Sequence, residues 1–442
     1  MSDELYPAVI APLVSKRAHE TLVKVKKFVD EECIPADTIY HEQVSHDPSK
    51  RWASVPPIIE ELKVKAKKLG LWNMFLHAHY KEGPGFTNVE YGLMAEQLGR
   101  CLVASEAVNC AAPDTGNMEV FAKYANEEQK REWLVPLLEG RIRSAFCMTE
   151  RFTASSDATN IQLSMRREGN EYVLNGRKWW ASGAGDPRCK VWLVMGKTDA
   201  SNPDRYRQQS VIIVPAHHPG SKVIRPTQIF GYDDAPHGHC EIEFTNCRVP
   251  AKNIVLGEGR GFEIIQGRLG PGRIHHCMRS IGAAEEALRY ILARVTSPER
   301  RTFGKVLADH ATVKAFIADA RIDIDAGRLL VLQAAHAIDV SSAKDAQGLI
   351  SSAKIYVPSM ALRVIDRAIQ LHGAGGVSQD FPLAYSYANQ RTLRIADGPD
   401  EVHRDQLGRR ELKRAERTTA LLKAQSAEVE RLRKQHNIAA KI

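Results

Sequence analysis

Apolar residues recur at helical spacing through the first third of the chain. Between Ala11 and Cys33 they fall three or four positions apart with Lys and Glu between them, which is the pattern of an amphipathic helix. Pro56 opens a second such segment that runs to Leu69, and the range 119–138 forms a third. The sequence therefore predicts an N-terminal helical domain over residues 1–143.

The pattern changes near Ser144 to an alternation of apolar and polar residues. Residues 161–165 and 172–174 alternate on either side of a Glu-Gly-Asn turn at 168–170, which predicts a β-hairpin. Further short apolar runs, separated by Gly and Pro, lie at 191–195, 211–214 and 240–244. We expect a small β-barrel or β-sandwich domain over residues 144–255.

Helical spacing returns after Pro250. Long apolar stripes cover residues 281–295, 309–340 and 349–371, and a highly charged helix is expected at 411–435. Long helices with one apolar stripe suit a four-helix bundle. The sequence predicts a C-terminal helical bundle with a basic tail helix over residues 256–442. The fold class is therefore α+β, mostly α.

Composition and charge limit the classes of protein to which this chain can belong. The chain has 442 residues and a net charge of +8. Residues 404–442 carry 11 Lys and Arg against 5 Asp and Glu, so the tail holds +6 of that charge. A solvated helix face is the first interpretation of such a tail, and affinity for nucleic acid or an anionic surface is the second. No apolar run approaches the roughly 18 residues of a membrane helix.

Cysteine and histidine usage argues against disulfides and metal. The eight cysteines are dispersed without a C-x-x-C pair, so we expect reduced, half-buried thiols in a reducing compartment. The segments His237-Gly238-His239-Cys240 and His275-His276 have too few partners at metal-ligand spacing, and no metal site is expected. Walker, Rossmann and G-x-S-x-G motifs do not occur.

Four stretches could carry chemistry, and each also has a structural interpretation. The hydroxyl-rich loop 146–160 could donate to a polar cofactor ring or cap the hairpin. The Trp pair at 179–180 could face a planar ligand or sit at a barrel edge. Glycines at 373–376 could approach a phosphate or end a helix. Asp397, before Gly-Pro, could be a general base or a helix N-cap.

Taken together, these stretches resemble the acyl-CoA dehydrogenases. Met148-Thr149-Glu150 looks like the flavin loop of that family, and Lys178-Trp179-Trp180 matches its second flavin contact. The segment 300–304 matches the R-x-T-F-G motif, and 370–376 resembles the Q-x-x-G-G loop with Ala374 replacing the second glycine. The resemblance covers about residues 10–420 and is strongest to the branch with human family members 10 and 11.

The resemblance implies FAD as cofactor and an acyl-CoA thioester as substrate. A base would take the α-proton while the β-hydride goes to flavin N5, leaving a trans-2-enoyl-CoA, as in fatty acid β-oxidation. Asp397 occupies the base slot that most relatives fill with Glu, and the alternative slot holds Gly272, which cannot act. The shorter side chain retracts the carboxylate, and exclusion of water should raise its pKa towards neutrality.

The resemblance also assigns the remaining site residues. The positions expected to bind FAD are Phe146, Met148, Thr149, Ser155, Ser156, Trp180, Ser182, Arg300, Gln370, Gly373, Ala374, Pro399 and Glu401. The positions expected at the acyl-CoA are Ser156, Gly270, Arg273 and Gly398. Arg300 and the 370–374 loop would serve the FAD of a neighbouring subunit, so we expect a homodimer or a homotetramer.

Partners and location have more than one interpretation. The electron acceptor would be electron-transferring flavoprotein or, in an acyl-CoA oxidase of the same fold, oxygen. A non-enzymatic acyl-CoA sensor and a nucleic-acid-associated flavoprotein are further alternatives. The C-terminal Ala440-Lys441-Ile442 resembles a variant peroxisomal address. Because the N-terminus is acidic and lacks a presequence pattern, a peroxisome is favoured over a mitochondrion or the cytoplasm.

Overall fold

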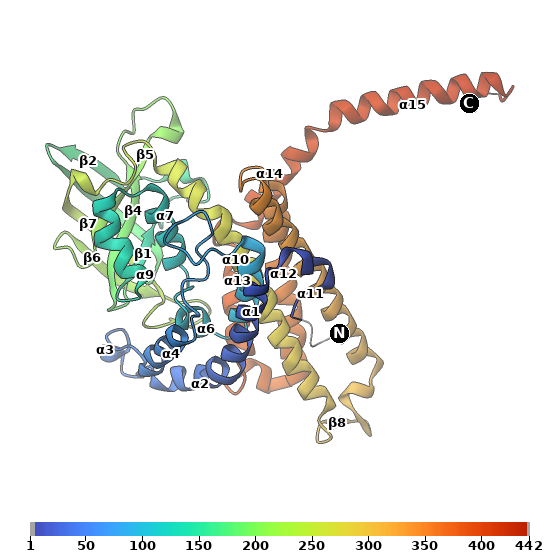
Figure 1. Cartoon of the computed structure of the whole chain (residues 1–442), viewed down its shortest axis with the longest axis horizontal. Helices are drawn as coiled ribbons and strands as arrows, with labels where there is room; N and C mark the ends of the chain where they lie inside the picture. The colour runs from blue at the N-terminus through green and yellow to red at the C-terminus, as the bar shows by residue number, and fades with distance from the viewer. Residues whose placement is uncertain (1–4, 440–442) are drawn as a thin grey trace.

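The computed structural model describes residues 5–439, apart from the side chains of 269–271. Gly270 and the tripeptide at 440–442 therefore lie outside the described residues. The chain runs from a helical region through a sheet region to a second helical region, with the strands in green on one side of Figure 1 and the long helices on the other. The predicted fold class is confirmed.

Short helices make up the first region. They are α1 (Lys16–Phe28), α2 (Ile34–Gln43), α3 (Pro48–Arg51), α4 (Pro57–Lys68), α5 (Asn88–Leu98), α6 (Ala104–Ala107), α7 (Asp114–Tyr124), α8 (Glu127–Gln129) and α9 (Val135–Leu138). The continuous helix expected at 119–138 is wrong. The chain is extended at Ala125, and Asn126 begins a new helix with a capping box to Gln129.

Seven strands form one curled sheet. They are β1 (Arg143–Cys147), β2 (Ser164–Glu168), β3 (Glu171–Ser182), β4 (Cys189–Lys197), β5 (Gln209–Pro215), β6 (Ser221–Thr227) and β7 (His239–Pro250). Their order is β1-β4-β2-β3-β7-β6, and β5 pairs with β4. The predicted hairpin is β2–β3, antiparallel from Ser164 opposite Asn175 to Glu168 opposite Glu171.

Strand β4 shows how the sheet joins two cores. Its residues Val191, Leu193 and Met195 pack into the core that the helices share, whereas Trp192 and Val194 pack into a second core on the other face. Successive side chains of a strand point to opposite faces, so a strand covered on both sides reads as a continuous apolar run. The sheet is thereby fixed against the helical body.

Long helices form the last region. They are α10 (Gly261–Thr296), α11 (Ala311–Val340), α12 (Gln347–His372), α13 (Leu383–Thr392), α14 (Asp400–Leu412) and α15 (Ala415–Gln435), with a small ribbon of β8 (Arg301–Thr302) and β9 (Lys305–Val306) after α10. Helix α10 packs against α5, α7, α11 and α12. It spans roughly 54 Å at 1.5 Å per residue. No helix of the described residues is long and apolar enough to cross a membrane.

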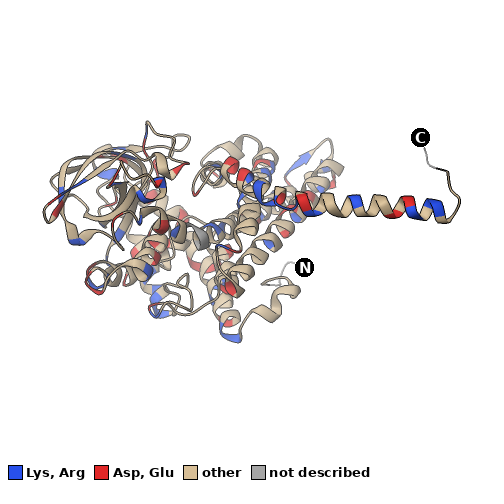
Figure 2. Ribbon diagram, turned by 90° about the horizontal axis from the view of Figure 1, so that it is seen from above, with Lys and Arg blue, Asp and Glu red and all other residues tan. Residues whose placement is uncertain are grey.

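The tail helix α15 projects away from the body (Figure 1). None of its residues is buried, and acidic and basic positions are interspersed along it (Figure 2). Several of its charges pair within the helix, including Arg431 with Glu428 and Arg433 with Glu430. The helix expected at 411–435 is therefore present from residue 415, and it is a solvated rod rather than a one-signed basic surface.

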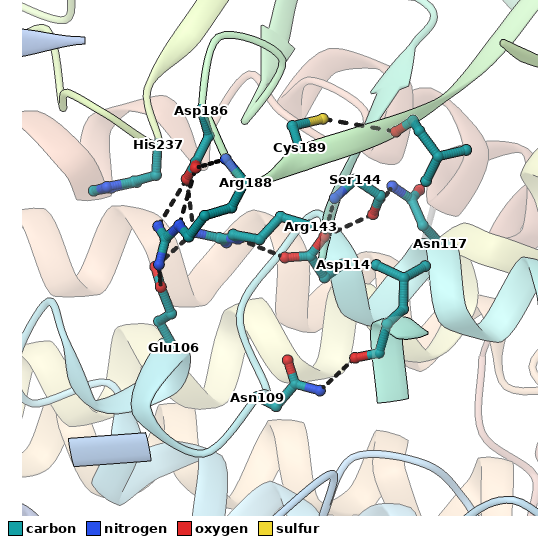
Figure 3. Close-up of polar contacts among 12 residues, drawn as sticks. Glu106, Asn109, Asp114, Asn117, Arg143, Ser144, Asp186, Arg188, Cys189 and His237 are labelled. Carbon is teal, nitrogen blue, oxygen red and sulfur yellow. Dashed lines mark hydrogen bonds and ion pairs between the residues drawn. The ribbon is translucent and has the colours of Figure 1, made fainter. Parts of the chain in front are cut away.

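A buried ion network joins the first helical region to the sheet (Figure 3). We define it by three cations and three carboxylates, Lys63, Arg143, Arg188, Glu106, Asp114 and Asp186. At its edge the exposed Glu60 also pairs with Lys63 and Arg188. Arg143 donates from Nε to Asp114 Oδ2 at 2.9 Å and from Nη1 to Glu106 Oε2 at 2.5 Å. Burial raises the pKa of Glu106, but Arg143, Arg188 and Lys63 outweigh it and hold that pKa well below its ordinary value.

All eight cysteines are free thiols, as expected. Seven of them are buried, and Cys101 is half-buried. Burial raises their pKa values, for example that of Cys147 to about 12. The thiols are therefore more deeply buried than the sequence indicated, and they remain protonated near neutral pH.

Candidate active site

Asp397 lies in a tight turn between α13 and α14. Its backbone is left-handed, with φ of 55°, and Gly398 follows with φ of 98°. A Cβ at position 398 would lie 2.9 Å from His403 Nε2, so this turn requires glycine. Arg273 Nε donates to the Asp397 carbonyl at 2.9 Å, and His403 Nε2 lies 3.3 Å from the same oxygen. The turn is thereby held against α10.

The Asp397 carboxylate meets a histidine. His276 Nε2 lies 3.2 Å from Asp397 Oδ2, and both side chains are about 20% exposed. Burial alone would raise the pKa of Asp397, but the hydrogen bond from His276 and the charges of Arg268 and Arg273 lower it below its ordinary value. The upward shift expected from the sequence is wrong, because these cationic and hydrogen-bonding partners outweigh the loss of water.

Asp397 is surrounded by a basic cluster, by which we mean Arg268, Arg273, His276, Arg279 and Lys354. Arg268 lies over the Phe146 ring, with its guanidinium carbon 4.4 Å from the ring centroid, and its Nε is 3.4 Å from Asn117 Oδ1. Burial lowers the pKa of Arg268, while Asp397 and Glu119 oppose that shift. Arg268 thereby links Phe146, an expected flavin contact, to the expected base.

The loop after β1 is tied to the end of β3. Lys178 Nζ donates to the Met148 carbonyl at 2.9 Å and to Glu150 Oε1 at 2.8 Å. The backbone N–H of Trp179 donates to the Thr149 carbonyl at 2.8 Å. Burial lowers the pKa of Lys178 to about 8, although Glu150 opposes that shift. The two expected flavin-binding stretches are therefore brought together, with Lys178 as their internal support.

Strand β3 bulges at its two tryptophans. Its register with β7 shifts between Lys178 and Ala181, and Trp180 adopts a left-handed φ of 58°. Such bulges re-aim side chains and are frequent next to active sites. Ser182 Oγ lies 2.7 Å from His239 Nδ1, and the Trp180 and His239 ring centroids are 5.1 Å apart.

The bulge also bears on whether these residues fit a flavin. Among the described residues, the buried Trp179 Nε1 has no hydrogen-bond partner. With the half-buried Trp180 ring it offers aromatic surface and one unpaired N–H, beside the Ser182 hydroxyl that His239 holds. A planar ring with polar edges fits such a lining, so the residues present fit the isoalloxazine of FAD.

The remaining cofactor positions form a second group. Arg294 Nη2 donates to the His372 carbonyl at 3.2 Å, and Arg300 is near enough to act on the pKa of both residues. Arg300 is thus close to the exposed loop that carries Gln370, Gly373 and Ala374. Arg273 and Arg294 are 21 positions apart on α10, roughly 30 Å. This group is therefore remote from Asp397 within one chain.

Three of the expected site residues are exposed or half-buried: Ser156, Pro399 and Glu401. Ser156 is exposed on the loop before β2, while Ser155 Oγ accepts from the Glu150 N–H at 2.9 Å. Pro399 is half-buried at the start of α14, and the exposed Glu401 pairs with Arg404 at 3.6 Å. Of the substrate positions, Arg273 and Gly398 flank Asp397.

Sequence reasoning missed His276, Arg268, Arg279 and Lys354 as neighbours of the base. The pair His275-His276 was set aside because it lacked metal-ligand spacing. A different signal was available, since Arg273, His276 and Arg279 follow one another at three-residue spacing. On a helix that spacing places them along one face. Only the fold could show that this face meets a residue more than a hundred positions away.

Comparisons with known proteins agree on one family. Three family models match: acyl-CoA dehydrogenase N-terminal domain at 16–141, middle domain at 145–247 and C-terminal domain at 259–412. Acyl-CoA dehydrogenase family member 11 of Gallus gallus is 53% identical over 90% of this chain and 51% of its own. FadE2 of Mycobacterium tuberculosis, assigned to the acyl-CoA dehydrogenases, is 50% identical over 92% of this chain and 98% of its own.

Solved structures give the same result. A Mycobacterium abscessus protein assigned to the acyl-CoA dehydrogenases has a TM-score of 0.87 and 48% identity, over 91% of this chain and 99% of that one. The chain spans about half the length of the family member 11 proteins it matches. The similarity to these proteins supports the predicted branch as well as the family.

Proposed function

The chain belongs to the acyl-CoA dehydrogenase family, and on this premise we propose that it is an FAD-dependent enzyme that dehydrogenates acyl-CoA thioesters between Cα and Cβ. The observation that carries the proposal is the half-buried carboxylate Asp397, whose charge acts on Arg268, the guanidinium that lies over the Phe146 ring. The strand end that bears Phe146 is itself tied to the Trp180 bulge. The base and the proposed flavin-lining surface are thus linked through Arg268.

In the proposed reaction Asp397 takes the α-proton of the thioester. Its backbone N–H makes no hydrogen bond among the described residues, so it can donate to the thioester oxygen. Negative charge develops on that oxygen as the proton leaves, and a fixed N–H aimed at it stabilises the transition state. FAD, when bound, supplies the acceptor for the β-hydride. The products are a trans-2-enoyl-CoA and the reduced cofactor.

The cationic surroundings also assist this step. Arg268 and Arg273 lie near Asp397 and lower the pKa of its carboxyl, so it is ionised and ready to accept a proton at neutral pH. The same charges favour the enolate that forms next to them. We assign acyl-CoA contacts to Ser156, Gly270, Arg273 and Gly398, of which Gly270 lies outside the described residues.

Assembly and location are further parts of the proposal. Arg300 and the 370–374 loop lie remote from Asp397, which supports their service to the FAD of a second copy and hence a homodimer or homotetramer. We retain the peroxisome as the proposed location on the sequence of residues 440–442. A role in fatty acid β-oxidation follows from the reaction type, with electron-transferring flavoprotein or oxygen as acceptor.

The test is anaerobic bleaching of the flavin absorbance. Purified full-length protein is mixed with butyryl-, octanoyl- and palmitoyl-CoA, and the yellow absorbance should fall with one of them and be restored by a dye acceptor. Peroxide formation in air would identify an oxidase instead. A yellow protein that binds these thioesters without bleaching would be a sensor, and a colourless protein that refuses FAD would overturn the proposal.

A further inference from the structure

The base of this chain is short, and the structure shows what surrounds it. Asp has one methylene fewer than the Glu of the family pattern, so its carboxylate reaches less far from the backbone. The left-handed turn at Asp397 and Gly398 is tied to α10 by Arg273. The carboxylate itself contacts α10 through His276 alone among its described hydrogen bonds and ion pairs.

The hydrogen bonds of His276 fix its tautomer. Arg279 Nη2 lies 3.0 Å from His276 Nδ1, and a guanidinium only donates, so Nδ1 must be the acceptor. The ring proton is then on Nε2, which lies 3.2 Å from Asp397 Oδ2 and faces it as the donor. Burial and Arg279 lower the pKa of His276, which keeps the ring neutral. Hydrogen bonding thus runs in one direction, from Arg279 through His276 to the accepting carboxylate of Asp397.

Other charged groups face this chain from three helices. Arg268 and Arg273 come from α10, Lys354 from α12, and His403 from α14. Burial lowers the pKa of His403 to about 4, so it is neutral near pH 7. Lys354 donates to the Leu393 carbonyl. These groups set the general field at Asp397, whereas His276 is the side chain that contacts its carboxylate.

We propose that His276, held as the Nε2–H tautomer by Arg279, is a positioning residue that binds Oδ2 of Asp397 and leaves Oδ1 to take the substrate proton. The proposal rests on Asp397 being the base. His276 thereby compensates for the missing methylene, because it fixes the direction in which the short carboxylate points. It also favours the ionised form, since a donated hydrogen bond stabilises a carboxylate.

The test compares His276→Leu with His276→Gln, whose amide retains an N–H donor. The readouts are flavin-reduction rate against pH, KM, flavin content and melting temperature, with whichever of butyryl-, octanoyl- or palmitoyl-CoA bleaches the wild type fastest. In His276→Leu the rate should fall about 10- to 100-fold at unchanged KM. Its acid limb should move to higher pH, because Asp397 loses a donor that lowered its pKa. His276→Gln should restore most of the rate and return the acid limb towards its wild-type pH.

Two further variants separate the possible failures. Arg279→Met frees the tautomer without touching Asp397, so it should give a smaller loss of rate, and it replaces His276→Leu if that variant fails to fold. Asp397→Asn tests the base itself. If Asp397→Asn is inactive while His276→Leu keeps wild-type rate and acid limb, the positioning role is wrong. If Asp397→Asn turns over, the base assignment fails first. Loss of flavin or stability with an unmoved acid limb would mean a structural role only.

Discussion

The buried ion network and the basic cluster contrast two ways of burying charge. In the network, three cations face three carboxylates, and each contact is a direct ion pair. In the basic cluster, Arg268 has no carboxylate within ion-pair distance among the described residues, and Arg273 donates to a backbone carbonyl. Asp397 is the carboxylate that the cluster encloses.

The difference indicates what each region is for. A buried ion pair is costly to break but contributes little net stability, so a matched network mainly fixes how two regions dock. An unmatched buried cation costs stability outright and persists where function needs it. The network therefore belongs to the joint between helices and sheet, and the cluster to chemistry on an anionic intermediate.

The largest expected effect is on turnover. Asp397→Asn removes the proposed base but keeps the size of the side chain, so kcat should fall about a hundred- to ten-thousand-fold with flavin content unchanged. Asp405→Asn is the matched control, because Asp405 is exposed on the neighbouring helix α14 and, within the part of the chain that the structure describes, pairs only with Arg409. Steady-state assays of both variants check the prediction, and equal activity in the two would contradict it.

The next effect is on folding. Arg143→Met leaves Glu106 and Asp114 buried without their shared partner, and unfolding free energy should fall by about 3–5 kcal/mol. Turnover per folded molecule should stay near wild type. Urea unfolding followed by fluorescence measures the loss. Adding Glu106→Gln and Asp114→Asn should recover part of it, and a loss that does not depend on these carboxylates would argue against the network.

The pH dependence of stability is a further difference between the basic cluster and the buried ion network. Burial raises the pKa of Glu119, which faces Arg268, from 4.5 to about 8. Between those pH values the folded carboxyl keeps a proton that the unfolded chain has lost, so unfolding releases a proton and rising pH destabilises the fold. Stability should fall by about 1 kcal/mol per pH unit in that window. Glu119→Gln should flatten the curve, as measured by melting temperature from pH 5 to 8.

The smallest effect has the opposite sign from the network. Arg268→Met replaces a half-buried cation, without a carboxylate partner among the described residues, by an apolar side chain, so unfolding free energy should rise by roughly 1 kcal/mol while flavin reduction slows. Calorimetry and bleaching rates measure the two changes. If Arg268→Met instead loses stability, as Arg143→Met should, then Arg268 stabilises the fold. The contrast between the buried ion network and the basic cluster would then be wrong.

The sequence predicted what depends on local periodicity. Residues 309–340 and 349–371 carry long apolar stripes, and α11 and α12 follow them within two residues. The hairpin of β2 and β3 follows from its alternation and its turn. The break at Ala125 was missed although the Asn126 to Gln129 capping box was present, because apolar spacing continues across it.

The site was predictable only in part, for a physical reason. Motifs marked Asp397, the 148–150 loop and the Trp pair, and the structure brings the last two together through Lys178. The environment that sets the Asp397 pKa comes from α10 and α12, far away in the chain. The direction of a pKa shift depends on how such distant charges pack around the group, which the sequence alone does not show.

The burial of the cysteines has a practical consequence. A thiol inside the core that also holds its proton is out of reach of an alkylating reagent until the surrounding structure opens. The rate at which such a reagent modifies the native protein therefore reports how often the structure around each buried cysteine opens. The seven buried cysteines, spread from residue 33 to residue 277, would report opening of the helices and of the sheet separately.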